Sequence, residues 1–147
     1  MKEHKSSCTV KHMDHVGIAV SNLESALEIY CKLLDSPPTP LIEAPELGLR
    51  AAIIAQGQTR IELLEPTNPD GPLGKFLESK GEGLHHIAFE VDNIAAKLEE
   101  LKDLGVPLVD QKSRQGLTGM IAFLRPEAVH NVLVELVQTE PDPSTEA

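Results

Sequence analysis

Hydrophobic and polar positions alternate in one short stretch of the chain, and a second, more apolar stretch resembles it. Residues 13–20 read MDHVGIAV and residues 83–91 read GLHHIAFEV, and the two superpose with His15 on His86. Apolar residues at every second position are typical of a β-strand with one buried face. An internal repeat determines the fold, so it has to be recognised before single elements are assigned. The pattern predicts two copies of one structural unit.

The similarity continues beyond these two strands. Apolar residues at helical spacing follow in both copies, and they predict helices at residues 23–34 and 94–104. The stretch TRIELLEP resembles VLVELVQT and sets Glu62 on Glu135. Further strands are expected at residues 41–44, 49–55, 59–64, 106–109, 120–124 and 133–137, and a helical turn at residues 73–79. Each copy is thus a βαβββ module, which predicts an α+β fold.

The length and the turn residues predict how the modules are organised. A chain of 147 residues fits one domain, expected at residues 13–138. Its modules cover about 13–66 and 84–138, and neither has enough apolar residues for a core of its own. Residues 1–12 and 139–147 are polar and are expected to be flexible tails.

The composition restricts the class of partner and the compartment. The chain has 13 Lys and Arg against 23 Asp and Glu, a formal charge of −10. Nucleic acids and anionic membranes attract basic surfaces, so neither is an expected partner. The two cysteines, the polar N-terminus and the absence of a long apolar stretch predict a cytoplasmic protein. The glycines at positions 81 and 83 match only part of a nucleotide-binding motif, so no nucleotide cofactor is expected.

Four ionisable residues recur at matching positions: one histidine on the first strand of each module and one glutamate on the last, namely His15, His86, Glu62 and Glu135. Each glutamate lies between apolar neighbours, where an unpaired charge is costly to bury. Two imidazole nitrogens and two carboxylates suit a divalent transition metal. The pattern leaves open a second interpretation, in which the four residues serve separate structural or solvent-facing roles. His85 is either structural or a hydrogen-bond partner of a ligand histidine.

Four longer stretches of the chain carry a family resemblance: DHVGIAVSNLESALEIY, IELLEPTNPDGPLGKFLESKGEGLHHIAFEVDNI, AFLRP and VLVELVQ. They resemble the methylmalonyl-CoA epimerase family, which belongs to the vicinal oxygen chelate superfamily together with glyoxalase I. The resemblance covers residues 13–138, and the second stretch is the part most specific to epimerases.

The resemblance implies a glyoxalase-like fold in which the two modules form a cupped mixed sheet. It implies a divalent metal (Co, Mn, Zn, Ni or Fe) held by His15, Glu62, His86 and Glu135, a small-molecule acyl-CoA substrate and a homodimer. The implied reaction inverts the carbon between the thioester and the carboxylate through an enolate that the metal stabilises. Glu135 is the candidate for one of the two proton-transfer roles.

The chain departs from the family at several positions. Some epimerases have a catalytic glutamate after the G-[VL]-[RKV] segment, where this chain has Ala51. The histidine of the family's FLHP segment is Arg125 here, and Glu62 replaces a ligand that is glutamine in some members. These departures leave open a glyoxalase I-type lyase with the same ligands, or a non-catalytic binding protein. Candidates for holding the CoA phosphates are Arg50, Lys112, Arg114 and Arg125.

Overall fold

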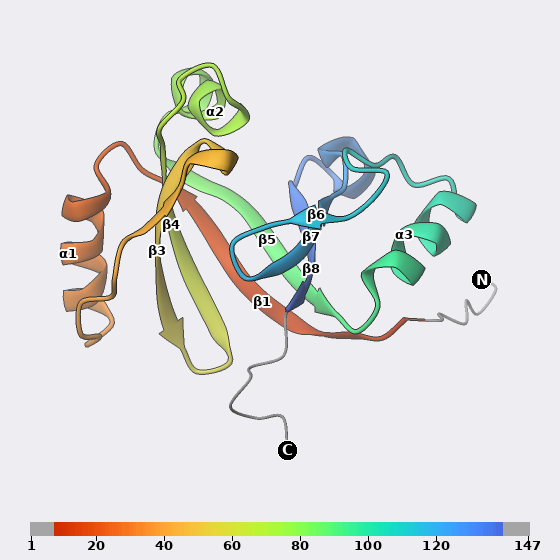
Figure 1. Ribbon diagram of the computed structural model, residues 1–147, viewed down its shortest axis with the longest axis horizontal. Helices are drawn as coiled ribbons and strands as arrows, with labels where there is room; N and C mark the ends of the chain where they lie inside the picture. The colour runs from red at the N-terminus through yellow and green to blue at the C-terminus, as the bar shows by residue number, and fades with distance from the viewer. Residues whose placement is uncertain (1–7, 140–147) are drawn as a thin grey trace. The chain divides into compact units, whose positions relative to one another are not determined.

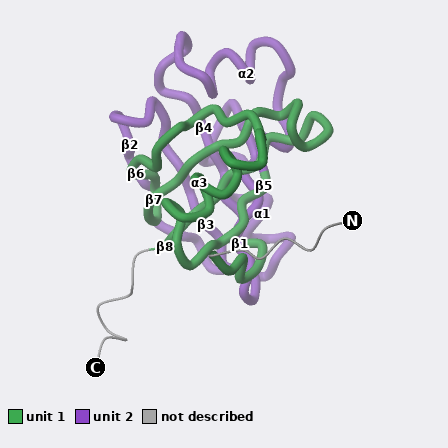
Figure 2. Tube along the Cα trace, turned by 90° about the vertical axis from the view of Figure 1, so that its right-hand side faces the viewer, with its two compact units in different colours: residues 1–13, 87–147 green, residues 14–86 purple. Residues whose placement is uncertain are grey.

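The computed structural model describes residues 8–139, and these form two compact units. Residues 14–86 make up one unit, while residues 8–13 and 87–139 make up the other (Figure 2). The boundaries fall inside two strands, β1 (Val10–Ala19) and β5 (Gly83–Val91). The tails were expected at residues 1–12 and 139–147, and most of both ranges lies outside the described residues, but residues 10–12 belong to β1 and residue 139 ends the last strand.

The unit of residues 14–86 contains the predicted first module. After β1 come α1 (Leu23–Leu33), β2 (Ile42–Ala44), a 3-10 turn (Pro45–Leu47), β3 (Leu49–Gln56), β4 (Thr59–Pro66) and α2 (Pro72–Lys80). The strand order is β2-β3-β4-β1, in which β1 and β4 run parallel and the other pairs are antiparallel.

The core of this unit lies between α1 and one face of its strands. Helix α1 buries Leu23, Leu27 and Cys31, and these side chains pack against Ala52, Ile54 and Leu63. Figure 1 shows α1 beside β3 and β4. The helix begins at Leu23 because the Asn22 side chain accepts a hydrogen bond from the Ser25 amide at 2.9 Å. Ile18 of β1 and the following Val20 belong to the same cluster, as the alternation of this strand predicts.

The second unit repeats the same order of elements. It contains α3 (Ile94–Asp103), β6 (Arg114–Gln115), β7 (Gly119–Phe123), a 3-10 turn (Pro126–Val129) and β8 (Val134–Thr139). Its strand order is β5-β8-β7-β6, with β5 and β8 parallel and the others antiparallel. Ile94 and Leu98 of α3 pack on Leu136 of β8. The predicted α+β fold of two βαβββ modules with mixed strand pairing is confirmed.

The structure differs from the expected elements at two places. Strand β1 begins at Val10, although residue 13 was the expected boundary, since Thr9 and Asp92 exchange hydrogen bonds of 2.8 and 3.1 Å. The strand expected at residues 106–109 is reduced to one bridge between Leu108 and Leu124, because Pro107 has no amide proton for a ladder. The short strand β6 lies instead in the segment expected to be a loop.

No helix within residues 8–139 has both the length and the hydrophobicity that crossing a lipid bilayer requires.

Candidate metal centre

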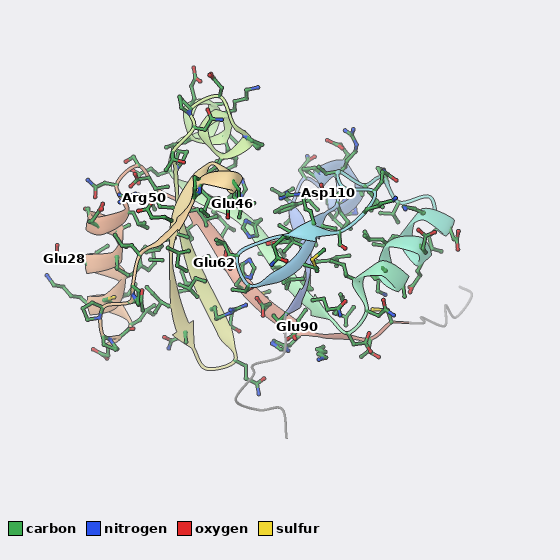
Figure 3. The ribbon with its side chains drawn as sticks, viewed as in Figure 1. Glu28, Glu46, Arg50, Glu62, Glu90 and Asp110 are labelled. Atoms are coloured by element: carbon green, nitrogen blue, oxygen red, sulfur yellow. The ribbon has the colours of Figure 1, made fainter. Side chains whose placement is uncertain are left out.

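Three of the four predicted ligands lie in the unit of residues 14–86. His15 comes from β1, Glu62 from β4 and His86 from β5 (Figure 3 labels Glu62). Their exposed fractions are 2%, 4% and 5%, so all three are buried. The parallel pairing of β1 with β4 sets Gly17 opposite Glu62, which places the carboxylate on the same face as His15.

The two histidines meet through the same ring nitrogen. Nε2 of His15 lies 2.9 Å from Nε2 of His86, and the rings are nearly perpendicular at 88°. Two nitrogens bound to one zinc ion, each at about 2.0–2.1 Å, lie within about 4 Å of each other. The Nε2 pair therefore has the spacing of two ligands on one ion.

Gly17 provides the space for the His86 ring. A Cβ atom at position 17 would lie 2.2 Å from Cε1 and 2.5 Å from Nδ1 of His86, far inside contact distance. The sequence predicts open space on this face of β1, and the structure shows that an imidazole occupies it. The ring fits only because residue 17 has no side chain. Glycine at this position therefore allows the two histidines to approach each other.

Glu62 and Asp14 both approach the other nitrogen of His15. Nδ1 of His15 lies 2.7 Å from Oδ2 of Asp14 and 3.3 Å from Oε2 of Glu62. The structure thus places an oxygen of Glu62 beside Nδ1 of His15. A carboxylate only accepts hydrogen bonds, so Nδ1 of His15 donates, and its Nε2 lone pair remains directed at His86.

Asp14 is a hydrogen-bond partner of His15 that the periodicity of the sequence does not reveal. It is 4% exposed and pairs with the Arg60 guanidinium as well as with His15. Burial alone would raise the pKa of the Asp14 carboxyl, but hydrogen bonds from His15 and Arg60 outweigh burial and hold that pKa below its ordinary value. The sequence offered two signals for this ion pair. Asp14 directly precedes His15, and Arg60 lies two residues before Glu62.

His85 is a hydrogen-bond partner of His86. Its Nδ1 lies 2.9 Å from Nδ1 of His86, although the two residues alternate on the strand. The His85 ring stands edge-on to Phe76 of α2, with centroids 4.7 Å apart and planes at 81°. Both ring nitrogens of His86 are therefore engaged, Nε2 by His15 and Nδ1 by His85.

Glu135 lies in the other unit, on β8, and is 4% exposed. It stands opposite Ala88 of β5, two positions beyond His86, just as Glu62 stands opposite Gly17, two positions beyond His15. The pairing registers of the two units thus match at the glutamates. The equivalence predicted from the repeat holds within each unit.

Residue 51, where some epimerases have a catalytic glutamate, is an alanine in this chain. Ala51 is fully buried on β3 and pairs with Leu64. Glu43 and Glu46 nearby are both exposed.

The candidate phosphate-binding residues have different surroundings. Arg50 donates to Glu65 at 2.9 and 3.2 Å and to Glu24 at 2.7 Å (Figure 3 labels Arg50). These bonds to Glu24 and Glu65 raise the pKa of Arg50 above its ordinary value. Glu65 also accepts from the Leu23 amide at 2.7 Å, so this network fastens the start of α1. Arg114 pairs with Asp110, whereas Lys112 and Arg125 are exposed.

Replacing Arg50 with Met is expected to lower the urea concentration at the unfolding midpoint, because the two partly buried charge-assisted hydrogen bonds to Glu65 are lost. Urea denaturation measures the change. Lys32→Met is the control, since its pair with Glu28 is exposed and contributes about 0.5 kcal/mol or less. Equal effects of the two substitutions would show that Arg50 does not fasten α1.

A comparison with protein families matches residues 14–123 to the glyoxalase/bleomycin resistance protein/dioxygenase superfamily. The repeated βαβββ module and the buried histidine pair agree with this class of protein. The chain belongs to that superfamily.

Individual relatives narrow the class. The chain is 37% identical to the uncharacterized protein YqjC of Bacillus subtilis, over 93% of this chain and 99% of that one. It is 37% identical to the mitochondrial methylmalonyl-CoA epimerase of Homo sapiens, over 86% of this chain and 73% of the relative. A solved methylmalonyl-CoA epimerase in complex with methylmalonyl-CoA and NH4+ superposes with a TM-score of 0.82 at 34% identity, covering 89% and 96% of the two chains.

Within the superfamily the chain is a member of the methylmalonyl-CoA epimerase family, and it is accordingly an isomerase of the epimerase type. The resemblance described from the sequence is confirmed.

Proposed function

We propose that the protein is a metal-dependent epimerase that inverts the carbon between the thioester and the carboxylate of methylmalonyl-CoA, or of a related 2-substituted acyl-CoA. The observation that carries the proposal is the buried pair of histidines whose Nε2 atoms lie 2.9 Å apart. Relatives named methylmalonyl-CoA epimerase, one of them solved with methylmalonyl-CoA, support the choice of substrate.

The donors present suit a divalent ion such as Co, Mn, Zn, Ni or Fe. Nε2 of His15 and Nε2 of His86 would supply the nitrogens, while Glu62 and Glu135 would supply the oxygens. The roles of the two glutamates rest on the repeat and on the family, since Glu62 lies beside Nδ1 of His15. When bound, such an ion polarises the substrate oxygens and stabilises the negative charge of the enolate.

The protein's own residues would move the proton. Glu135 is the proposed base, because it is buried and occupies the position equivalent to Glu62. A second group would return a proton on the opposite face, and Ala51 is not that group.

The assembly and the compartment are also part of the proposal. We expect a homodimer by family resemblance, and Ile29 and Leu33 of α1 offer exposed apolar surface, at 60% and 70%. We expect the cytoplasm because Cys8 and Cys31 form no disulfide within the described residues.

The test is exchange of the α-proton of methylmalonyl-CoA in deuterated water. The protein loaded with Co²⁺ is expected to introduce deuterium at the α-carbon, a chelator is expected to stop the exchange, and added Co²⁺ is expected to restore it. Mass spectrometry of the recovered thioester measures the label. No exchange in the presence of metal would refute the epimerase function. Turnover of a methylglyoxal–thiol adduct would favour the glyoxalase I-type lyase, and tight acyl-CoA binding without exchange would favour a binding protein.

A further inference from the structure

The residues that precede the two histidines occupy equivalent positions in the repeat. Asp14 precedes His15 and His85 precedes His86. Each contacts Nδ1 of the histidine that follows it, Asp14 through Oδ2 at 2.7 Å and His85 through its own Nδ1 at 2.9 Å. The repeated strand thus places a polar partner behind each histidine, on the side of the ring away from the Nε2 pair.

The two partners differ in what they can do with a proton. The Asp14 carboxylate pairs with the Arg60 guanidinium, and a carboxylate only accepts hydrogen bonds. A neutral imidazole accepts at one nitrogen and donates at the other, and the two roles can interchange. His85 is held in place for this by its edge-on contact with Phe76.

With neutral rings and a carboxylate at Asp14, these contacts allow one arrangement of the protons. Asp14 accepts from Nδ1 of His15, so Nε2 of His15 is an acceptor and Nε2 of His86 must be the donor. His86 then has no proton on Nδ1 and accepts one hydrogen bond from Nδ1–H of His85. An ion on both Nε2 atoms is incompatible with this state, because the proton on Nε2 of His86 occupies its place.

We propose that His85 is a positioning residue that reverses its hydrogen-bonding role when a divalent ion binds. The proton of His86 moves from Nε2 to Nδ1 and is donated to Nδ1 of His85, whose own proton moves to Nε2. Each ring keeps one proton and no net proton is released. Asp14 cannot reverse in this way, so the switch belongs to His86 alone. The proposal rests on the metal centre of the proposed function.

The test measures Zn²⁺ binding by calorimetry in two variants of the full chain. His85→Phe keeps a flat ring against Phe76 but removes both nitrogens, and it is expected to weaken Zn²⁺ binding by about 10- to 100-fold. His85→Asn restores an oxygen that accepts from Nδ1 of His86, and its affinity is expected to stay within about 3-fold of the unsubstituted protein. His130→Asn removes an exposed imidazole from another turn and serves as the control.

A second readout does not depend on affinity. Nitrogen NMR of ¹⁵N-histidine protein is expected to show Nδ1 of His86 without a proton before Zn²⁺ is added and with a proton afterwards. Unchanged Zn²⁺ affinity in His85→Phe, or an Nδ1 that stays unprotonated with Zn²⁺ bound, would overturn the proposal. Either result combined with normal α-proton exchange would leave the epimerase function standing, whereas the expected switch without exchange would refute only the epimerase function.

Discussion

Substituting Glu135 with Gln is expected to slow α-proton exchange by about 10²- to 10⁴-fold, the range that loss of a general base produces. The amide keeps the size of the side chain and an oxygen for a metal, but it cannot accept a proton. Deuterium incorporation into methylmalonyl-CoA measures the rate, and calorimetry with Zn²⁺ measures whether metal binding survives.

Glu62→Gln is the matched control, because Glu62 is buried to the same extent, at 4% exposure, and occupies the equivalent register position. This substitution is expected to slow exchange by no more than about 10-fold, since a neutral oxygen ligand still polarises the substrate through the ion. A larger loss in Glu62→Gln than in Glu135→Gln would reverse the assigned roles of the two carboxylates.

Replacing Gly17 with Ala is expected to weaken Zn²⁺ binding by about 100-fold or more, because His86 has to leave its place or β1 has to move. The added Cβ would lie 2.2 Å from Cε1 of His86, and the neighbouring atoms are ring atoms of a buried side chain. Overpacking of this kind also destabilises a fold, by about 1–3 kcal/mol. Calorimetry and urea denaturation measure the two effects separately.

Val16→Ala separates loss of stability from loss of the site. Val16 is the neighbour of Gly17 on β1 and points to the opposite face of the strand. Its truncation is expected to lower the free energy of unfolding by about 1 kcal/mol and to leave Zn²⁺ affinity unchanged. A Gly17→Ala protein that binds Zn²⁺ as tightly as Val16→Ala would show that the His86 ring does not need the space above Gly17.

The order of elements could be predicted from the sequence because it depends on patterns that the chain carries locally. Alternation identified β1, the repeat and an apolar run identified β5, and helical spacing after Asn22 and Asn93 identified α1 and α3. The repeat then assigned the same role to His15 and His86, and their contact follows from the strands that carry them.

The partners of these histidines could not be predicted in the same way. Arg60 lies opposite His15 only because β1 and β4 pair in one particular register, and alternation does not fix the register between distant strands. His85 was expected to face away from His86, yet its ring turns back to Nδ1 of its neighbour. The rotamer of a side chain depends on how it packs. The His85 ring packs against Phe76, and the alternation of residues along the strand does not predict this contact.

The contact between Phe76 and His85 has a practical consequence for spectroscopy. The chain contains no tryptophan and only one tyrosine, so its natural ultraviolet emission is weak. Phe76→Trp would place a single indole edge-on to the imidazole behind His86. The fluorescence of this single indole would come from a known location, so a change in its intensity would report the binding of an ion.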